Sequence, residues 1–211
     1  MFFDEDVPIP LDGVRLDARL SMPTRRSGVV VFAHDGGPQG DLHVARTLQR
    51  EHLATVLVDL LPGGDGGVDV PVLAGRLAAV VDWLTDQPAT SGHPIGLFGV
   101  GGGAAVALVT AAERPVAVRA VVCRGGRVDL AGDALTRVLA PTLLIVGERD
   151  EDGVARNREA ARRLRSSGRL EVVPGADHLF EEPGALDQVT RLTARWFHRH
   201  VGNAPVMPPA S

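Results

Sequence analysis

Short runs of consecutive apolar residues alternate along this chain with longer segments whose apolar residues recur every three or four positions. The short runs are rich in valine, isoleucine and leucine, as is typical of strands buried on both faces of a parallel sheet. They predict strands at residues 29–33, 54–58, 95–98, 118–123, 141–147 and 170–173. The periodic segments predict helices, at residues 41–52, 71–85, 152–166 and 183–200.

The two ends of the chain have different patterns. Residues 7–21 predict a β-hairpin, because apolar and polar side chains alternate after the turn signal Asp12-Gly13. Residues 201–211 contain three prolines, and we expect them to form a disordered tail. Strands that alternate with helices predict a doubly wound, mostly parallel sheet in one α/β domain over residues 1–200, without a lid domain.

Residues 93–112 are the most informative stretch, because a short apolar strand, a glycine turn and an alanine-rich helix follow one another. The turn has the spacing of a nucleophile elbow, G-x-S-x-G, with Gly99 and Gly103 in place and Gly101 where the serine would stand. It also has the spacing of a dinucleotide-binding fingerprint, G-x-G-x-x-A, that ends at Ala104. Spacing alone leaves both interpretations open.

The carboxyl ends of the predicted strands are where an open α/β sheet places its site. Chemically capable residues at these ends are His34, Asp35, Asp59, Cys123, Arg124, Asp150 and His178. The order of the Gly101 turn, Asp150 and His178 matches the chain order Ser…Asp…His of hydrolase triads. Dinucleotide binding gives no reason for that order and is kept as a minor alternative.

Composition excludes several classes of function. All 22 basic residues other than histidine are arginine, so neither a Schiff-base lysine nor a P-loop lysine is present. The net charge of −4 without a basic stripe argues against nucleic acid as a partner. A single cysteine allows no internal disulfide. The histidines follow no metal-binding pattern such as H-E-x-x-H, and we expect neither a metal nor a cofactor.

Localisation is expected to be cytoplasmic. The N-terminal sequence MFFDEDVPIP is acidic and lacks the basic-then-apolar order of a signal peptide. No apolar run approaches the roughly 18 residues that a membrane span needs. We therefore expect no membrane partner, but a small-molecule substrate or ligand.

Five motifs in this order along the chain are informative together. They are VVVFAH at 29–34, VLVDLL at 56–61, VVCRGGRVDLAG at 121–132, APTLLIVGERD at 140–150 and EVVPGADHLFEEPGAL at 171–186. With these motifs the chain resembles the α/β-hydrolase superfamily in its compact branch, similar to dienelactone hydrolase. The resemblance extends to small bacterial members that are also found fused to phosphoribosyltransferase domains, and it covers roughly residues 7–200.

The resemblance implies a serine hydrolase with its nucleophile at position 101, its acid at Asp150 and its base at His178. It also implies an oxyanion hole formed by the backbone N–H of Gly102 and by the loop that contains His34, Asp35 and Gly36.

Two residues depart from the family pattern. Gly101 has no hydroxyl, so no acyl-enzyme can form there. Asp35 stands where the family usually has glycine. A carboxylate about 4 Å from a developing oxyanion would repel it by roughly 4 kcal/mol at an effective dielectric constant of about 20. That repulsion corresponds to about a thousandfold in rate.

Several residues have two interpretations. Cys123, with Arg124 to lower its pKa, is a candidate replacement nucleophile, but a buried structural thiol is the ordinary role of a free cysteine. Arg124 and Arg127 either bind an anionic group of a substrate or form surface ion pairs. Asp152 competes with Asp150 for the role of the acid.

Three hypotheses about function follow. In the first, His178 and Asp150 activate water or transfer a proton on a small ester or lactone. In the second, the protein is a catalytically silent relative that binds a ligand or partner. In the third, the glycine turn binds a dinucleotide.

Overall fold

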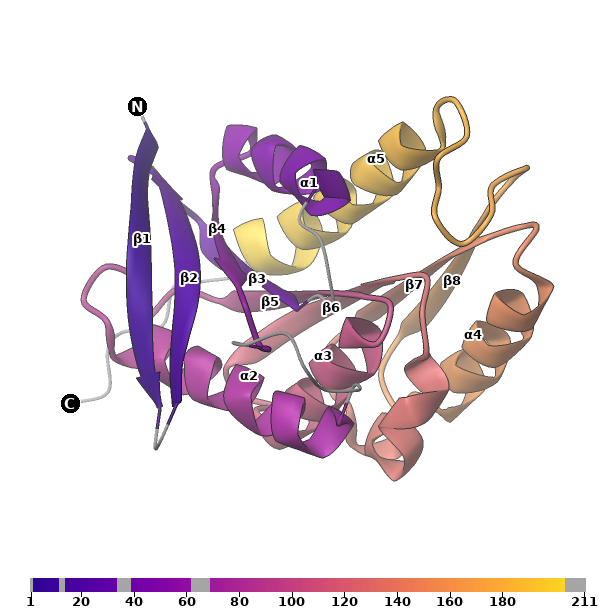
Figure 1. The fold of residues 1–211 in the computed structure, drawn as a ribbon, viewed down its shortest axis with the longest axis horizontal. Coiled ribbons are helices and arrows are strands. Elements are labelled where there is room, and N and C mark those ends of the chain that lie inside the picture. The colour runs from indigo at the N-terminus through magenta and orange to yellow at the C-terminus, as the bar shows by residue number, and fades with distance from the viewer. Residues whose placement is uncertain (1, 12–13, 34–38, 62–68, 204–211) are drawn as a thin grey trace.

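One eight-stranded sheet forms the centre of the computed structural model, which describes residues 2–11, 14–33, 39–61 and 69–203. Strands β3 to β8 run parallel, whereas β1 pairs antiparallel with β2 and β2 with β4. The strand order β1-β2-β4-β3-β5-β6-β7-β8 is shown in Figure 1. The predicted doubly wound, mostly parallel sheet is therefore confirmed. The strands are β1 (Phe2–Leu11), β2 (Val14–Pro23), β3 (Gly28–Ala33), β4 (Leu53–Val58), β5 (Ile95–Val100), β6 (Val118–Arg124), β7 (Thr142–Gly147) and β8 (Gly168–Val173).

Helices cover both faces of this sheet (Figure 1). Every residue of β3 and β7 is buried, which explains why these strands are uninterrupted apolar runs. One face carries α1 (Gln39–Arg50) and α5 (Ala185–Phe197), and the π-helical turn η2 (His198–Gly202) follows α5. The other face carries α2 (Val70–Asp86), α3 (Gly103–Glu113), α4 (Glu151–Arg163) and the 3₁₀ segment η1 (Val128–Arg137). None of the helices among the described residues has the length and apolar character needed to span a membrane.

Two predicted boundaries are wrong. The hairpin begins at Phe2 and not at residue 7, and its turn at Asp12-Gly13 lies outside the described residues. The tail does not begin at Val201, whose side chain is fully buried. A Cβ at Gly28 would lie 2.3 Å from a methyl group of Val201, so the missing side chain at position 28 provides space for it. The π-helical turn η2 extends to Gly202, and residues 204–211 lie outside the described part of the chain.

The parallel arrangement determines where the candidate site forms. Because β4 to β8 all run in one direction, the residues that follow them lie along the same edge of the sheet. Residues 59, 101, 125, 150 and 178 all follow strand ends at this edge. The loop with His34, Asp35 and Gly36 follows β3 but lies outside the described residues, so the roles expected of it stay predictions.

Candidate active site

The turn after β5 has the sharp geometry of a nucleophile elbow. Gly101 has a φ of 58°, in the left-handed region that favours glycine. A Cβ at Gly99 would lie 2.6 Å from the Gly103 carbonyl oxygen, so the turn closes too tightly for any side chain there. Gly102 is buried and forms the N-cap of α3. The backbone therefore has the shape that presents a serine, although residue 101 carries no oxygen atom.

A second glycine turn, after β6, joins the elbow to the loop that carries His178. Gly126, with a φ of 105°, packs so closely on the elbow that a Cβ would lie 2.2 Å from the carbonyl oxygen of Gly101. The neighbouring Gly125 would place a Cβ 3.4 Å from the carbonyl oxygen of His178. The backbone N–H of Arg127 donates to the Gly101 carbonyl oxygen at 3.2 Å. The elbow and the His178 loop thus contact adjacent residues of the same turn.

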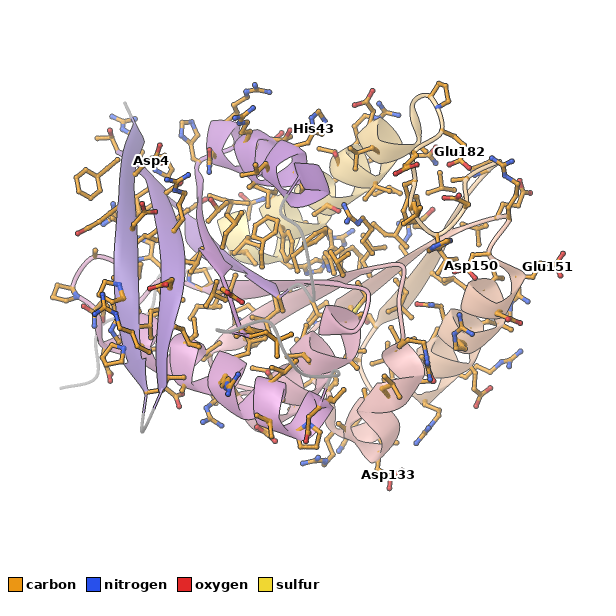
Figure 2. The ribbon with its side chains drawn as sticks, in the orientation of Figure 1. Asp4, His43, Asp133, Asp150, Glu151 and Glu182 are labelled. Carbon is orange, nitrogen blue, oxygen red and sulfur yellow. The ribbon has the colours of Figure 1, made fainter. Side chains whose placement is uncertain are left out.

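Asp150 and His178 line one cavity of about 350 Å³. Asp150 is half-buried at the start of α4, where its Oδ1 accepts a hydrogen bond from the Gly153 backbone N–H at 2.8 Å. His178 is exposed in the loop after β8. Asp152 lines the same cavity and is exposed, so both candidate acids remain beside His178. Figure 2 shows Asp150 at the N-terminal end of α4.

The guanidinium of Arg156 lies close to Asp150. Nη2 of Arg156 is 3.9 Å from Oδ1 of Asp150, and Nε of Arg156 is 3.9 Å from the Asp129 carboxylate. The N-terminal end of α4 adds a favourable dipole at Asp150. Arg156 therefore places its positive charge close to the carboxylates of both Asp150 and Asp129.

The loop that carries His178 is fixed by two acidic residues that the sequence analysis did not identify. Oε1 of Glu182 accepts the backbone N–H of Asp177 at 3.0 Å and also pairs with the Arg149 guanidinium. Oδ1 of Asp177 accepts the N–H groups of Leu179 at 2.7 Å and Phe180 at 3.2 Å. Glu182 therefore ties the turn that ends in Asp150 to the loop that contains His178. Motif patterns could not reveal it, because its partners are a backbone group and an arginine 33 residues away.

Cys123 does not lie in the cavity. Its side chain is completely buried, and the thiol donates to the Ala104 carbonyl oxygen of α3 at 3.8 Å. Burial raises the pKa of the Cys123 thiol far above its usual range. A thiol that stays protonated and out of contact with solvent is a poor nucleophile. The hypothesis of a replacement nucleophile at Cys123 is therefore wrong.

The two arginines after β6 have different surroundings. The guanidinium of exposed Arg127 makes a two-pronged contact with Asp129, and this contact lowers the pKa of the Asp129 carboxyl. Of the two roles considered for Arg127, the structure therefore shows the surface ion pair. Arg124 is half-buried, with its guanidinium carbon 5.9 Å from the ring centre of Phe98. Arg124 is the last residue of β6, at the edge of the sheet where the candidate site lies. Anion binding by Arg124 stays a prediction.

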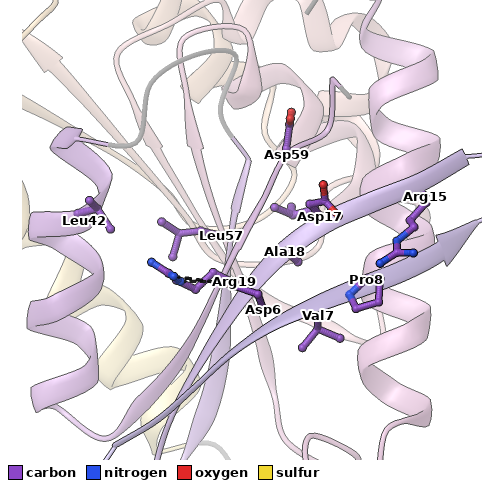
Figure 3. A pocket seen from close by; sticks show the side chains of 11 residues that line it. Asp6, Val7, Pro8, Arg15, Asp17, Ala18, Arg19, Leu42, Leu57 and Asp59 are labelled. Atoms are coloured by element: carbon purple, nitrogen blue, oxygen red, sulfur yellow. Dashed lines mark hydrogen bonds and ion pairs between the residues drawn. The ribbon is translucent and has the colours of Figure 1, made fainter. Parts of the chain in front are cut away.

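A larger hollow lies elsewhere, between the hairpin and α1 (Figure 3). Its volume is about 560 Å³, and its walls include Leu42, Leu57 and the ion pair between Arg19 and Asp6. It shares no described lining residue with the cavity at Asp150 and His178. We place the candidate active site at the smaller cavity, because Asp150 and His178, the predicted acid and base, line it.

Comparisons with known proteins agree with this arrangement. Residues 68–200 match the dienelactone hydrolase family. The crystal structure of dienelactone hydrolase from Anabaena variabilis superimposes with a TM-score of 0.91 at 42% identity, covering 95% of this chain and 99% of that one. Est1E from Butyrivibrio proteoclasticus, in a complex with ferulic acid, shares the fold with a TM-score of 0.78 at 18% identity, covering 93% and 100% of the two chains.

A longer relative matches over only part of its length. A Mycobacterium tuberculosis protein named "Putative phosphoribosyl transferase" is 45% identical over 207 residues. The match covers 94% of this chain and 47% of the relative. This chain therefore spans about half the length of the curated relatives that it matches.

Proposed function

Because the chain belongs to the dienelactone hydrolase family, we propose that it acts slowly on a small ester or lactone by activating water directly. In this proposal His178 is the general base, Asp150 orients it, and a water molecule occupies the space above Gly101 where a serine hydroxyl would stand. The name of the longer mycobacterial relatives describes proteins about twice this length, and we propose no phosphoribosyl transfer for this chain.

The proposed reaction has one chemical intermediate. The imidazole of His178 takes a proton from water while the water oxygen bonds to the substrate carbonyl carbon, which gives a tetrahedral oxyanion. The N-terminal end of α3 and its aligned peptide dipoles favour the negative charge. Protonated His178 then returns the proton to the leaving alkoxide as the C–O bond breaks. The products are a carboxylic acid and an alcohol, or a hydroxy acid from a lactone, without an acyl-enzyme.

The observation that supports this proposal most is the retained elbow geometry. Gly101 keeps the left-handed backbone conformation, and the glycine turn at Gly125 and Gly126 contacts both the elbow and the His178 loop. Hydrolases that lose one triad member keep about 10³–10⁴-fold acceleration over water from binding and the oxyanion hole. We expect an acceleration of that order over the uncatalysed reaction, which is far below the acceleration by a serine hydrolase.

A second candidate function is ligand binding by a catalytically silent relative. It is favoured by the partners that Asp150 already has, namely the Gly153 N–H at 2.8 Å and Arg156 at 3.9 Å. A carboxylate engaged as a helix cap contributes to stability whether or not it orients a histidine. Both functions use the same cavity and the same class of small carbonyl ligand.

A single-turnover assay separates the two candidates. Hydrolysis of p-nitrophenyl acetate by excess protein is measured for the wild type, for His178→Ala and for the control His43→Ala, which removes an exposed histidine on α1. We expect His178→Ala to lower the rate about a hundredfold or more and His43→Ala to leave it unchanged. Equal rates in all three proteins would remove the proposal and favour the silent relative.

The dinucleotide hypothesis has its own test. A nucleotide that binds the folded state stabilises it by mass action, so NADPH or NADH at saturating concentration would raise the melting temperature. We expect no shift, since the elbow geometry gives the glycine turn another role.

A further inference from the structure

The two edges of the sheet differ in their ability to accept another strand. At one edge, β1 contains Pro8 and Pro10, which lack N–H donors, and the acidic run Asp4, Glu5 and Asp6. At the other edge, β8 has the sequence GRLEVV, without proline, and β7 is its single neighbour among the described strands. Proline and clustered charge are the usual protection of an edge strand against pairing. By this criterion β1 is protected and β8 is open.

The outward-facing backbone groups of β8 belong to its even-numbered residues. The Thr142 N–H donates to the Ser167 carbonyl at 3.3 Å, and the Glu148 N–H donates to the Val173 carbonyl at 3.0 Å. Backbone groups in a strand point alternately to the two sides, so the odd-numbered residues of β8 bond to β7. The N–H and C=O groups of Gly168, Leu170 and Val172 therefore point away from the sheet.

From this geometry we propose that β8 pairs antiparallel with β8 of a second copy of the chain, about a two-fold axis at Leu170. Leu170 then faces Leu170 of the other copy as a hydrogen-bonded pair, and Gly168 faces Val172 in both directions. Every outward N–H and C=O from residue 168 to residue 172 gains a partner. The two sheets join into one continuous sheet of sixteen strands, twice the eight of each copy.

The side chains of β8 are self-complementary in this register. Arg169 of each copy faces Glu171 of the other, in the non-hydrogen-bonded pairs where side chains approach most closely. Within one chain these two residues already form an ion pair, with exposed fractions of 64% and 25%. On the opposite face of the strand, the exposed side chain of Val172 faces Gly168 of the other copy, where the side chain of Leu164 already occupies the place of a Cβ and offers an apolar contact. The same two-fold axis at Leu170 therefore brings opposite charges together on one face of the strand and apolar groups together on the other.

Helix α4 adds a second complementary pattern. It connects parallel strands β7 and β8 and therefore runs antiparallel to β8. Its first turn carries Glu151 and Asp152, and its last turn carries Arg162 and Arg163. The two-fold axis reverses α4 of the second copy, so the acidic end of each helix lies on the same side of the interface as the basic end of the other. Opposite charges in this arrangement favour the proposed orientation over the parallel one.

The dimer is tested by sedimentation equilibrium on wild type, Arg169→Glu, Glu171→Arg and the double charge swap. We expect the wild type to reach twice the chain mass of 22.2 kDa. Each single substitution places like charges opposite each other twice, so we expect the dissociation constant to rise at least about tenfold. The double swap restores both ion pairs and should restore the dimer. Glu5→Arg on β1 is the control that leaves association unchanged.

Hydrogen exchange locates the interface independently. In the wild type, the outward amides of Leu170 and Val172 should exchange slowly, and Arg169→Glu should accelerate them. A monomeric wild type at high concentration, or a dimer whose dissociation constant is unchanged by both Arg169→Glu and Glu171→Arg, would overturn the proposal. It does not rest on the proposed function, because the interface contains neither Gly101 nor His178.

Discussion

At the scale of single residues, Gly101 separates the shape of the site from its chemistry. Its φ of 58° is the conformation that a nucleophile elbow imposes on a serine. In the left-handed region a Cβ atom approaches the following carbonyl oxygen, at a cost of about 1–2 kcal/mol. Glycine avoids that cost. The site thus combines the backbone shape of a nucleophile elbow with a residue that has no nucleophilic oxygen.

Substitution of Gly101 should reveal this strain. We predict that Gly101→Ala and Gly101→Ser each lower the free energy of unfolding by about 1–2 kcal/mol, since both add a Cβ at the same backbone conformation. Urea denaturation measures the change. A Gly101→Ala protein as stable as the wild type would show that position 101 is not held in the left-handed region.

The thiol of Cys123 gives a prediction about reactivity. The thiol is buried beneath α3, and this burial raises its pKa. At neutral pH we therefore expect Cys123 to react with a disulfide reagent only after the protein has unfolded. Labelling is followed spectrophotometrically with and without urea. Rapid labelling of the folded protein would restore Cys123 as a candidate nucleophile.

At the scale of elements, the loop after β8 is held by contacts that cross between segments. Glu182 connects Arg149, the residue before Asp150, with the backbone of Asp177, the residue before His178. Asp177 then caps the turn that leads to buried Phe180, which itself has a left-handed φ of 59°. The position of His178 therefore depends on hydrogen bonds made by Glu182 and Asp177.

Removal of this clamp should loosen the loop without unfolding the protein. We predict that Glu182→Ala raises the amide exchange rate of Asp177 about tenfold, because its hydrogen-bond acceptor is lost. Glu182→Gln keeps an acceptor oxygen but loses the charge opposite Arg149, so its effect should be smaller. The exchange of amides in β3 serves as the internal control. Unchanged exchange at Asp177 in Glu182→Ala would contradict the proposed clamp.

The sequence predicted secondary structure best for strands whose side chains are buried on both faces of the sheet. The strand at residues 29–33 was predictable because both of its faces lie in the core, so its pattern is continuous. The 3₁₀ segment η1, from Val128 to Arg137 with a kink at Gly132, is not among the helices that the apolar periodicity predicted. Its end positions depend on packing against α3 and α4, which a local pattern does not contain.

At the scale of the whole molecule, the parallel sheet brings residues that are distant in the sequence to one edge. Gly101, Asp150 and His178 are far apart in the chain, yet each follows a strand whose carboxyl end lies at one edge. Chain order therefore predicted which residues lie along that edge. It could not predict the contacts of Asp150 with Gly153 and Arg156, or the burial of Cys123, because these depend on side-chain direction. The same sheet leaves β8 open at its far edge, where we propose that a second copy binds.

The central claim is that the scaffold keeps a usable acid and base around a missing oxygen, and Gly101→Ser tests it most directly. Esterase activity on p-nitrophenyl acetate is compared for the wild type, Gly101→Ser, Gly101→Ala and the double variant Gly101→Ser with His178→Ala. We predict that Gly101→Ser exceeds the wild-type rate at least about a hundredfold. Gly101→Ala and the double variant should show no such gain. A folded Gly101→Ser protein no more active than Gly101→Ala would contradict the claim.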